Sequence, residues 1–227
     1  MDKSNNHTAF DAAEYDEKIK KALPYYDEFF VQIISAVRAF AYTPADWLDV
    51  GCGTGKMYAE AVGQIRINRF VFCDCSEEML KIAESRFCGS GREFFLKDML
   101  ELDFSDEFDI VTSVQSMHYI RPEQRSAAVK NCFNALRQGG IFLNFENFSP
   151  DSEAVERLAL KRWRDYQLAN GRSKAECDKH LSRYKKEYFP LTLSEQLEIM
   201  KNAGFAAAEV FWLSYMQAGF IGVKPKL

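Results

Sequence analysis

Short apolar runs recur along the chain, and polar or turn-forming residues separate them. Five runs are rich in β-branched and aromatic residues and have the length of strands: Asp46–Val50, Arg69–Asp74, Glu93–Lys97, Phe108–Val114 and Gly140–Asn147. Stretches with helical periodicity lie between them. Because strands that alternate with helices are joined by right-handed crossovers, the pattern predicts a parallel sheet.

Two further strand-like runs, Glu209–Leu213 and Met216–Val223, end the chain and are joined tightly. A connection that short forms a hairpin, so the last strand should be antiparallel to its neighbours. The expected fold is α/β and Rossmann-like, with a seven-stranded, mostly parallel sheet, an antiparallel last strand and helices on both faces.

Two helical segments stand outside this alternation. Residues Ala9–Ala41 have the pattern of two helices interrupted at Pro24. A second segment follows the fifth strand and should begin as a helix at Ser149-Pro150, an N-cap before a proline. We expect one domain over residues 1–227, with a helical cap (1–43) and a helical insertion (149–190) as a lid over the carboxyl edge of the sheet.

Capping signals divide the second segment further. Asn170-Gly171 should close its first helix, and Ser173 to Glu176 forms a capping box for the next one. A second capping box, Thr192 to Glu195, begins a helix that Gly204 should end.

Bulk properties exclude several classes of protein. The chain has 227 residues, of which 47% are hydrophobic, enough to bury a full core. No apolar run is long enough to span a membrane and the polar start has no signal-peptide core, so we expect a cytoplasmic protein. The net charge of −4 gives no footprint for nucleic acid, and the positive run Lys179–Lys186 is expected to be a solvated helix face.

The six cysteines have neither zinc-site nor disulfide-framework spacing. They form no C-x-x-C pair and have no histidine at ligand spacing. We expect buried, reduced thiols and no metal site.

A glycine-rich loop follows the first strand. The loop reads Asp49-Val50-Gly51-Cys52-Gly53-Thr54-Gly55-Lys56, so an acid is followed closely by the pattern G-x-G-x-G. Glycines at this spacing let a ligand approach the backbone. It does not fit the P-loop, because Val50 stands where the first glycine is required and Met57 follows Lys56. It does not fit the dinucleotide fingerprint either, because Lys56 replaces the third glycine.

Acids and polar residues recur where the next strands end. Asp74 ends the second strand, where a carboxylate can accept both ribose hydroxyls, and Ser76 should cap a helix with Met79 in its first turn. Asp98 follows the third strand and is placed either to accept from an exocyclic amine or to cap a turn. The fourth strand delivers Gln115 and the residues after it into the same cleft.

In combination these residues resemble the class I S-adenosylmethionine-dependent methyltransferases. The motifs that carry the resemblance are LDVGCGTG, VFCDCSEEML, FFLKDM, FDIVTSVQSMHYI and ALRQGGIF. The resemblance implies S-adenosylmethionine as cofactor and S-adenosylhomocysteine as product. It implies a methyltransferase domain whose cofactor-binding residues are Tyr26, Asp49, Gly51, Cys52, Gly53, Thr54, Gly55, Asp74, Cys75, Ser76, Met79, Lys97, Asp98, Met99 and Gln115.

The insertions resemble one branch of this family more closely. Tyr166–Glu176, Ala203-Gly204-Phe205 and Gln217–Lys224 are similar to carboxy-S-adenosylmethionine synthases, in which a tyrosine at the position of Tyr26 reaches the cofactor. That branch carries an arginine for the added carboxylate where this chain has Leu181, and Arg183 substitutes for it only if the register slips. We therefore interpret the chain as a relative of those synthases.

Three functions remain open. The first is methyl transfer to a small-molecule acceptor, with His118, supported by Tyr119, as the candidate base if the acceptor is a phenol or alcohol. The second is synthesis of a carboxylated cofactor from prephenate, for modification of the tRNA wobble uridine. The third is a non-catalytic cofactor-binding protein, and a homodimer is an open alternative to a monomer. The fourth strand lacks the N-P-P-Y type tetrapeptide, so direct action on nucleic acid is not expected.

Overall fold

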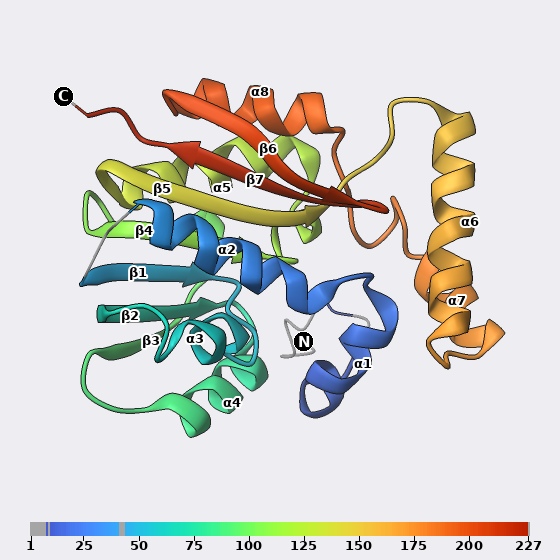
Figure 1. Cartoon of the computed structure of the whole chain (residues 1–227), viewed down its shortest axis with the longest axis horizontal. Helices are drawn as coiled ribbons and strands as arrows, with labels where there is room; N and C mark the ends of the chain where they lie inside the picture. Colours follow the sequence, from blue (N-terminus) through green and yellow to red (C-terminus); the bar gives the residue numbers. More distant parts are fainter. Residues whose placement is uncertain (1–7, 9, 41–43, 227) are drawn as a thin grey trace.

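The computed structural model describes residues 8, 10–40 and 44–226, so part of the predicted 1–43 cap lies outside the described residues. Its sheet has the strand order β3-β2-β1-β4-β5-β7-β6 (Figure 1). The strands are β1 (Ala45–Val50), β2 (Ile67–Asp74), β3 (Arg92–Leu96), β4 (Phe108–Val114), β5 (Leu136–Asn147), β6 (Ala207–Ser214) and β7 (Gln217–Val223). Strands β1 to β5 pair in parallel, and β7 is antiparallel to both β5 and β6. The predicted seven-stranded sheet with its antiparallel last strand is confirmed.

Helices cover both faces of the sheet. On one face, α2 (Tyr26–Phe40), α3 (Lys56–Ala61) and α4 (Glu77–Phe87) share a buried cluster with Trp47 and Phe70. On the other face, α5 (Pro122–Ala135) and α8 (Leu193–Ala203) pack with Leu48 and Phe142. Both clusters bury aromatic and branched side chains that the strand pattern had placed inside.

The N-terminal segment has the predicted interruption. A short 3-10 turn (Ala12–Glu14) leads into α1 (Tyr15–Ala22), and α2 begins at Tyr26, two residues after Pro24. Helix α2 lies on the sheet, where Phe29 packs against Phe145 and Trp212 with both ring centroids 5.2 Å away. Helix α1 instead reaches the glycine loop, so the two helices have different roles.

The insertion consists of α6 (Glu153–Ala169) and α7 (Lys174–Leu181), which stand together at one end of the molecule beside α1 (Figure 1). Trp163 Nε1 donates to the Ala22 carbonyl at 2.7 Å, which joins α6 to α1. The capping boxes at Ser173 and Thr192, and the helix ends at Asn170 and Gly204, lie where they were predicted.

The predicted helix start at Ser149 is wrong. Strand-like pairing continues past β5, since the Ser149 amide donates to the Leu191 carbonyl at 2.8 Å. The N-cap is Ser152, whose hydroxyl accepts from the Val155 amide, and Ser149 Oγ donates to Glu156 at 2.9 Å instead.

The expectation of a solvated face over Lys179–Lys186 holds for its lysines, which are exposed, but not for His180 and Arg183. Helix α7 ends at Leu181, and His180 and Arg183 are each only 8% exposed. The His180 ring packs against Trp163 with centroids 5.3 Å apart, because the insertion closes onto α1 and turns this side of α7 inward. Of the cysteines, Cys52, Cys73, Cys132 and Cys177 are buried as expected, whereas Cys75 is half-buried and Cys88 is exposed.

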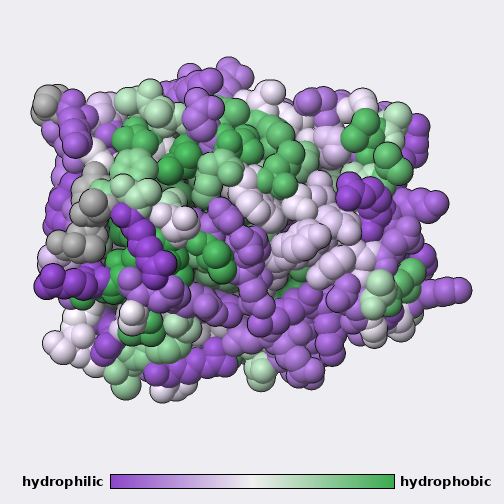
Figure 2. Space-filling view, viewed as in Figure 1, coloured by the Kyte–Doolittle hydropathy of each residue, from purple (hydrophilic) through white to green (hydrophobic). Residues whose placement is uncertain are grey.

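The surface in the same orientation combines apolar patches over β6 and β7 with mainly hydrophilic side chains over α1 (Figure 2). Leu213 on the β6 edge is 53% exposed. No helix in the described part of the chain is long and apolar enough to cross a membrane. Among these residues no cluster of metal-ligating side chains is found either.

Candidate functional site

The glycine loop lies where the strand order reverses, after β1 and between β2 and β4. This is the position at which open α/β sheets bind ligands. Gly51 has φ +69° and Gly53 has φ +54°, conformations that favour glycine. A Cβ at Gly51 would lie 2.3 Å from the Ser116 Cβ, whereas one at Gly53 would meet no atom of the described residues within 4 Å. The loop therefore packs tightly on the β4 side at Gly51 and is open at Gly53.

Asp74 joins the loops that follow β1 and β2. Its Oδ2 accepts from the Gly53 amide and its Oδ1 from the Ser76 amide, both at 2.8 Å. Ser76 in turn accepts from the Met79 amide at 3.4 Å, which caps α4 as predicted. The Asp74 carboxylate thus fixes the backbone on two sides of the cleft.

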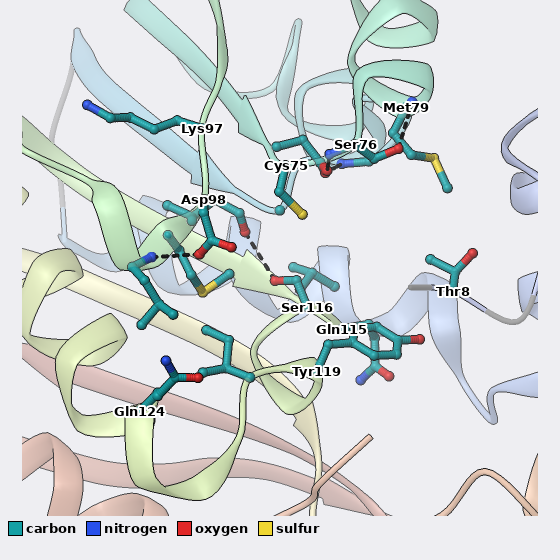
Figure 3. Close-up of a pocket in the computed structure, with 18 of the residues that line it drawn as sticks. Thr8, Cys75, Ser76, Met79, Lys97, Asp98, Gln115, Ser116, Tyr119 and Gln124 are labelled. Atoms are coloured by element: carbon teal, nitrogen blue, oxygen red, sulfur yellow. Dashed lines mark hydrogen bonds between the residues drawn. The ribbon is translucent and has the colours of Figure 1, made fainter. Parts of the chain in front are cut away.

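A cavity of about 290 Å³ lies over this edge of the sheet (Figure 3). It brings together many of the residues that the sequence nominated: Gly51, Gly53, Asp74, Cys75, Ser76, Met79, Lys97, Asp98, Met99, Gln115 and Tyr119. Ser116, expected in the cleft after the fourth strand, also lines it, whereas the sequence did not indicate other lining residues, including Thr8, Tyr15, Leu100, Ile120, Arg121 and Gln124. Gln115 and Tyr119 lie at one end, away from the Ser76 and Met79 end (Figure 3).

Four nominated residues lie behind the glycine loop. Tyr26, Asp49, Cys52 and Thr54 line a smaller cavity of about 30 Å³ that also contacts Gly51 and Gly53. Gly55 lines neither cavity, and a Cβ there would lie 2.8 Å from the Phe87 ring. Its side of the loop packs against α4.

Asp49 is a buried acid directly beneath the loop. Thr112 Oγ1 donates to its Oδ1 at 2.7 Å and itself accepts from Trp47 Nε1 at 2.9 Å. Burial, opposed by the Thr112 hydrogen bond, raises the pKa of Asp49 from 3.8 to about 7. A cationic group placed beside Asp49 would favour its ionised form.

The residues that end β3 adopt the capping arrangement. Asp98 Oδ1 accepts from the Leu100 amide at 2.8 Å and caps the 3-10 turn Met99–Glu101. Lys97 pairs with Asp103 at 2.5 Å. Asp98 is exposed and lines the cavity, so capping leaves its carboxylate at the cavity wall.

Gln115 follows β4 with a positive φ of +55°, which is uncommon for a residue other than glycine. Its amide donates to the Phe145 carbonyl at 2.7 Å. Strained backbone of this kind is frequent at ligand sites. It presents Gln115 at the cavity end that it shares with Tyr119.

His118 lies beside the main cavity and does not line it. It lines an adjoining cavity with Gln115 and Tyr119, and its Nδ1 lies 2.5 Å from Oε2 of Glu146. Glu146 on β5 also accepts from the backbone amides of residues 116–118 and from Asn144. Sequence reasoning missed Glu146, although an acid inside the apolar run Gly140–Asn147 was a signal for it.

Contacts of Asp16 hold α1 beside the glycine loop. Asp16 accepts from Thr54 Oγ1 at 2.6 Å and from Arg86 Nη1 at 2.7 Å. The neighbouring Tyr15 lines the main cavity. These contacts hold the start of α1 at the cavity wall, and they were not predicted from the sequence.

Comparisons with known proteins agree on the type of domain. Residues 48–140 match the methyltransferase domain family. The chain is 28% identical over 215 residues to the carboxy-S-adenosyl-L-methionine synthase of Nautilia profundicola. The aligned residues cover 94% of this chain and 92% of the relative. It is 27% identical to the synthase of Helicobacter hepaticus, over 90% of this chain and 89% of that one.

Solved structures show the same fold. An S-adenosylmethionine-dependent methyltransferase from Clostridium acetobutylicum superposes with a TM-score of 0.65 at 16% identity, covering 95% of this chain and 98% of that one.

Proposed function

The chain carries a methyltransferase domain on the fold of class I S-adenosylmethionine-dependent methyltransferases, and from this premise we propose that it methylates a small-molecule acceptor. The observation that carries the proposal is the cavity that joins the open glycine loop and Asp74 to Gln115 and Tyr119. When bound, S-adenosylmethionine supplies a methyl group activated by its sulfonium, and catalysis then requires mainly positioning and exclusion of water.

The lining residues fit this cofactor. Asp74 offers a carboxylate for the ribose hydroxyls, and Met79 with Met99 offers thioethers against a flat base. Asp49 and Tyr26 would hold the amino-acid end behind the loop. The glycine loop lacks the first glycine and the final Ser or Thr of a P-loop, and it lacks the third glycine of a pyrophosphate-binding fingerprint, in keeping with a cofactor without phosphates.

The role proposed for Asp49 predicts a pH dependence. Its folded pKa of about 7 lies above the ordinary 3.8, so its contribution to folding stability should be lost as the pH rises through about 7. Cofactor affinity should move the opposite way, because the ionised carboxylate binds the amino group. We expect S-adenosylhomocysteine to bind about tenfold more tightly at pH 7.5 than at pH 5.5. Both pH values lie below about 7.7–8.0, where an α-amino group loses its proton, so the amino group of the ligand stays charged.

Calorimetric titrations at several pH values measure this dependence. Asp49→Asn should bind more weakly and show a flat profile over the same range. An equal pH slope in wild type and Asp49→Asn would exclude Asp49 as the titrating group.

The small-molecule reaction has a direct test. Purified protein is incubated with labelled S-adenosylmethionine and a broad panel of amines, acids and phenols, and S-adenosylhomocysteine is measured. We expect acceptor-dependent formation of this product. Tight cofactor binding without turnover on any acceptor would instead favour a non-catalytic cofactor-binding protein.

A second candidate is synthesis of a carboxylated cofactor. The relatives that carry this name cover most of the chain, and Arg183 hydrogen-bonds Tyr119 at the end of the main cavity. Arg183 is thus a cation close to where an added carboxylate would lie. Incubation with S-adenosylmethionine and prephenate, followed by mass spectrometry, separates the two reactions, because a carboxylated cofactor would contradict methyl transfer as the main activity.

The setting of the reaction follows from the same features. The six cysteines are free thiols, which suits a reducing compartment, and we propose that the protein acts in the cytoplasm. The acceptor should be a small molecule, since the charge of −4 offers no general attraction for nucleic acid.

A further inference from the structure

Three cavities follow one another from the cofactor cavity to the outside of α7. The first is the main cavity described above. The second, which we call the neck, is lined by Gln115, His118, Tyr119, Arg183 and Tyr188 among others and measures about 20 Å³. The third, the outer groove, measures about 380 Å³ and lies between α1 and α7. The neck shares Gln115 and Tyr119 with the main cavity, and His180 and Arg183 with the outer groove.

The neck has room for about one oxygen atom. A cavity needs roughly 10–15 Å³ of this kind of volume to hold a water molecule. Tyr188 is only 2% exposed, and its hydroxyl finds no hydrogen-bond partner within the described part of the chain. Buried hydroxyl groups are normally satisfied, so this one indicates a missing polar partner in the neck. A single hydroxyl group of a ligand would meet both the space and the hydrogen-bonding requirement.

His118 in the neck is oriented as a base. Glu146 is 2% exposed and accepts several backbone amides, and its pKa is lowered because His118, Arg125 and these amides outweigh the effect of burial. An ionised Glu146 accepts the proton of Nδ1, which leaves the lone pair on Nε2. No hydrogen bond to Nε2 is found among the described residues. His180 is not equivalent, since burial lowers its pKa to about 3 and its Nδ1 lies 3.0 Å from Gln167 Oε1.

The outer groove is cationic in a chain whose net charge is negative. Its lining holds Lys18, Arg172, Lys179 and Arg183 against two carboxylates, Glu176 and Glu187. Lys18 pairs with Glu14 and Arg183 pairs with Glu187.

The other two groove cations have no carboxylate partner among the described residues. Arg172 donates to Gln167 Oε1 and to the Glu176 carbonyl, and it lies over the Phe10 ring. Across residues 8, 10–40 and 44–226, neither Arg172 nor Lys179 forms an ion pair with a carboxylate. This excess positive charge favours an anionic ligand.

We propose that the acceptor is an anionic small molecule whose charged body lies in the outer groove while its hydroxyl group enters the neck and is deprotonated by His118. This inference rests on the proposed methyl transfer and names its acceptor class. The hydroxyl proton moves to Nε2 of His118, and the acceptor oxygen forms a bond to the methyl carbon. The bond from that carbon to sulfur breaks, its electron pair stays on sulfur, and the imidazolium beside Glu146 later returns the proton to water.

The orientation of His118 is tested without any acceptor. The chain has three histidines, His7, His118 and His180, so nitrogen-15 spectra of the rings are simple and His118→Asn assigns one signal. We expect the neutral His118 ring to carry its proton on Nδ1 in wild type, and the proton to shift at least partly to Nε2 in Glu146→Gln. A neutral wild-type ring protonated on Nε2 would overturn the role of His118.

The acceptor class is tested with hydroxybenzoates and aliphatic hydroxy acids, each paired with its neutral amide. We expect the acids to be methylated with kcat/KM at least tenfold above their amides. Lys179→Glu should reduce this preference three- to tenfold, mainly through KM, whereas the matched variant Lys201→Glu on α8 should not. Tyr188→Phe should lower kcat on the acids with S-adenosylhomocysteine binding unchanged.

The outcomes separate this inference from the proposed function. Turnover limited to neutral or cationic acceptors, or none with any of the acids, would overturn it while S-adenosylhomocysteine binding stays intact. If the wild-type protein does not bind S-adenosylhomocysteine at all, the cofactor site itself is refuted.

Discussion

Asp74→Ala should weaken the binding of S-adenosylhomocysteine by about 10- to 100-fold. The carboxylate is placed to accept from the ribose, and charge-assisted hydrogen bonds of this kind contribute roughly 1.5–3 kcal/mol. It also accepts from the amides of Gly53 and Ser76, so its removal frees the glycine loop and the start of α4. Isothermal calorimetry of the purified variant measures the effect.

A matched control is available at the same edge of the sheet. Asp103 is an exposed acid that pairs with Lys97 and does not line the cavity, so Asp103→Ala should bind as wild type does. Asp74→Asn keeps one acceptor oxygen and should lie between wild type and Asp74→Ala. Wild-type affinity in Asp74→Ala would refute the ribose assignment.

Gly51→Ala should have the largest effect on both folding and binding. The new Cβ would meet Ser116 at 2.3 Å, and the backbone has φ +69°. Backbone strain at a left-handed φ should cost about 1–2 kcal/mol, and overpacking against Ser116 should cost about 1–3 kcal/mol. Together they should lower the free energy of unfolding by about 3 kcal/mol. Because the loop is displaced, binding of S-adenosylhomocysteine should fall below detection.

Gly63→Ala separates strain from overlap. Gly63 has φ +79° and a Cβ there would meet nothing within 4 Å, so this variant carries the strain alone. It should lose about 1 kcal/mol and retain cofactor binding. Urea unfolding and calorimetry of both variants provide the comparison, and equal losses in the two would contradict the packing of Gly51 on Ser116.

The strands were predictable because their burial leaves a strong signal. Val71 and Phe142 lie in runs that are apolar on both faces, as a strand covered by helices on each side requires. The hairpin of β6 and β7 followed from loop length alone, and the caps at Ser173 and Thr192 followed from local chemistry. Each of these features depends on residues close together in the sequence.

The remaining features depend on contacts between distant segments. Helix α6 begins after Ser152 and not at the predicted Ser149, because Ser149 pairs with Leu191. Arg183 is buried and not solvated, because α6 and α7 close onto α1. The contacts of Glu146 with His118 and of Asp16 with Thr54 and Arg86 were missed for the same reason, since these partners lie 28 to 70 residues away. The residues at the strand ends of one sheet edge could be predicted, whereas the contacts that the helical segments make with one another and with this edge could not.

A crystal structure grown with S-adenosylhomocysteine tests the central claim most directly. We expect the ligand to lie with its ribose on Asp74, its base beside Met79 and Asp98, its amino group near Asp49 and its sulfur facing Gln115 and Tyr119. A ligand bound elsewhere, or one whose ribose makes no contact with Asp74, would contradict the account.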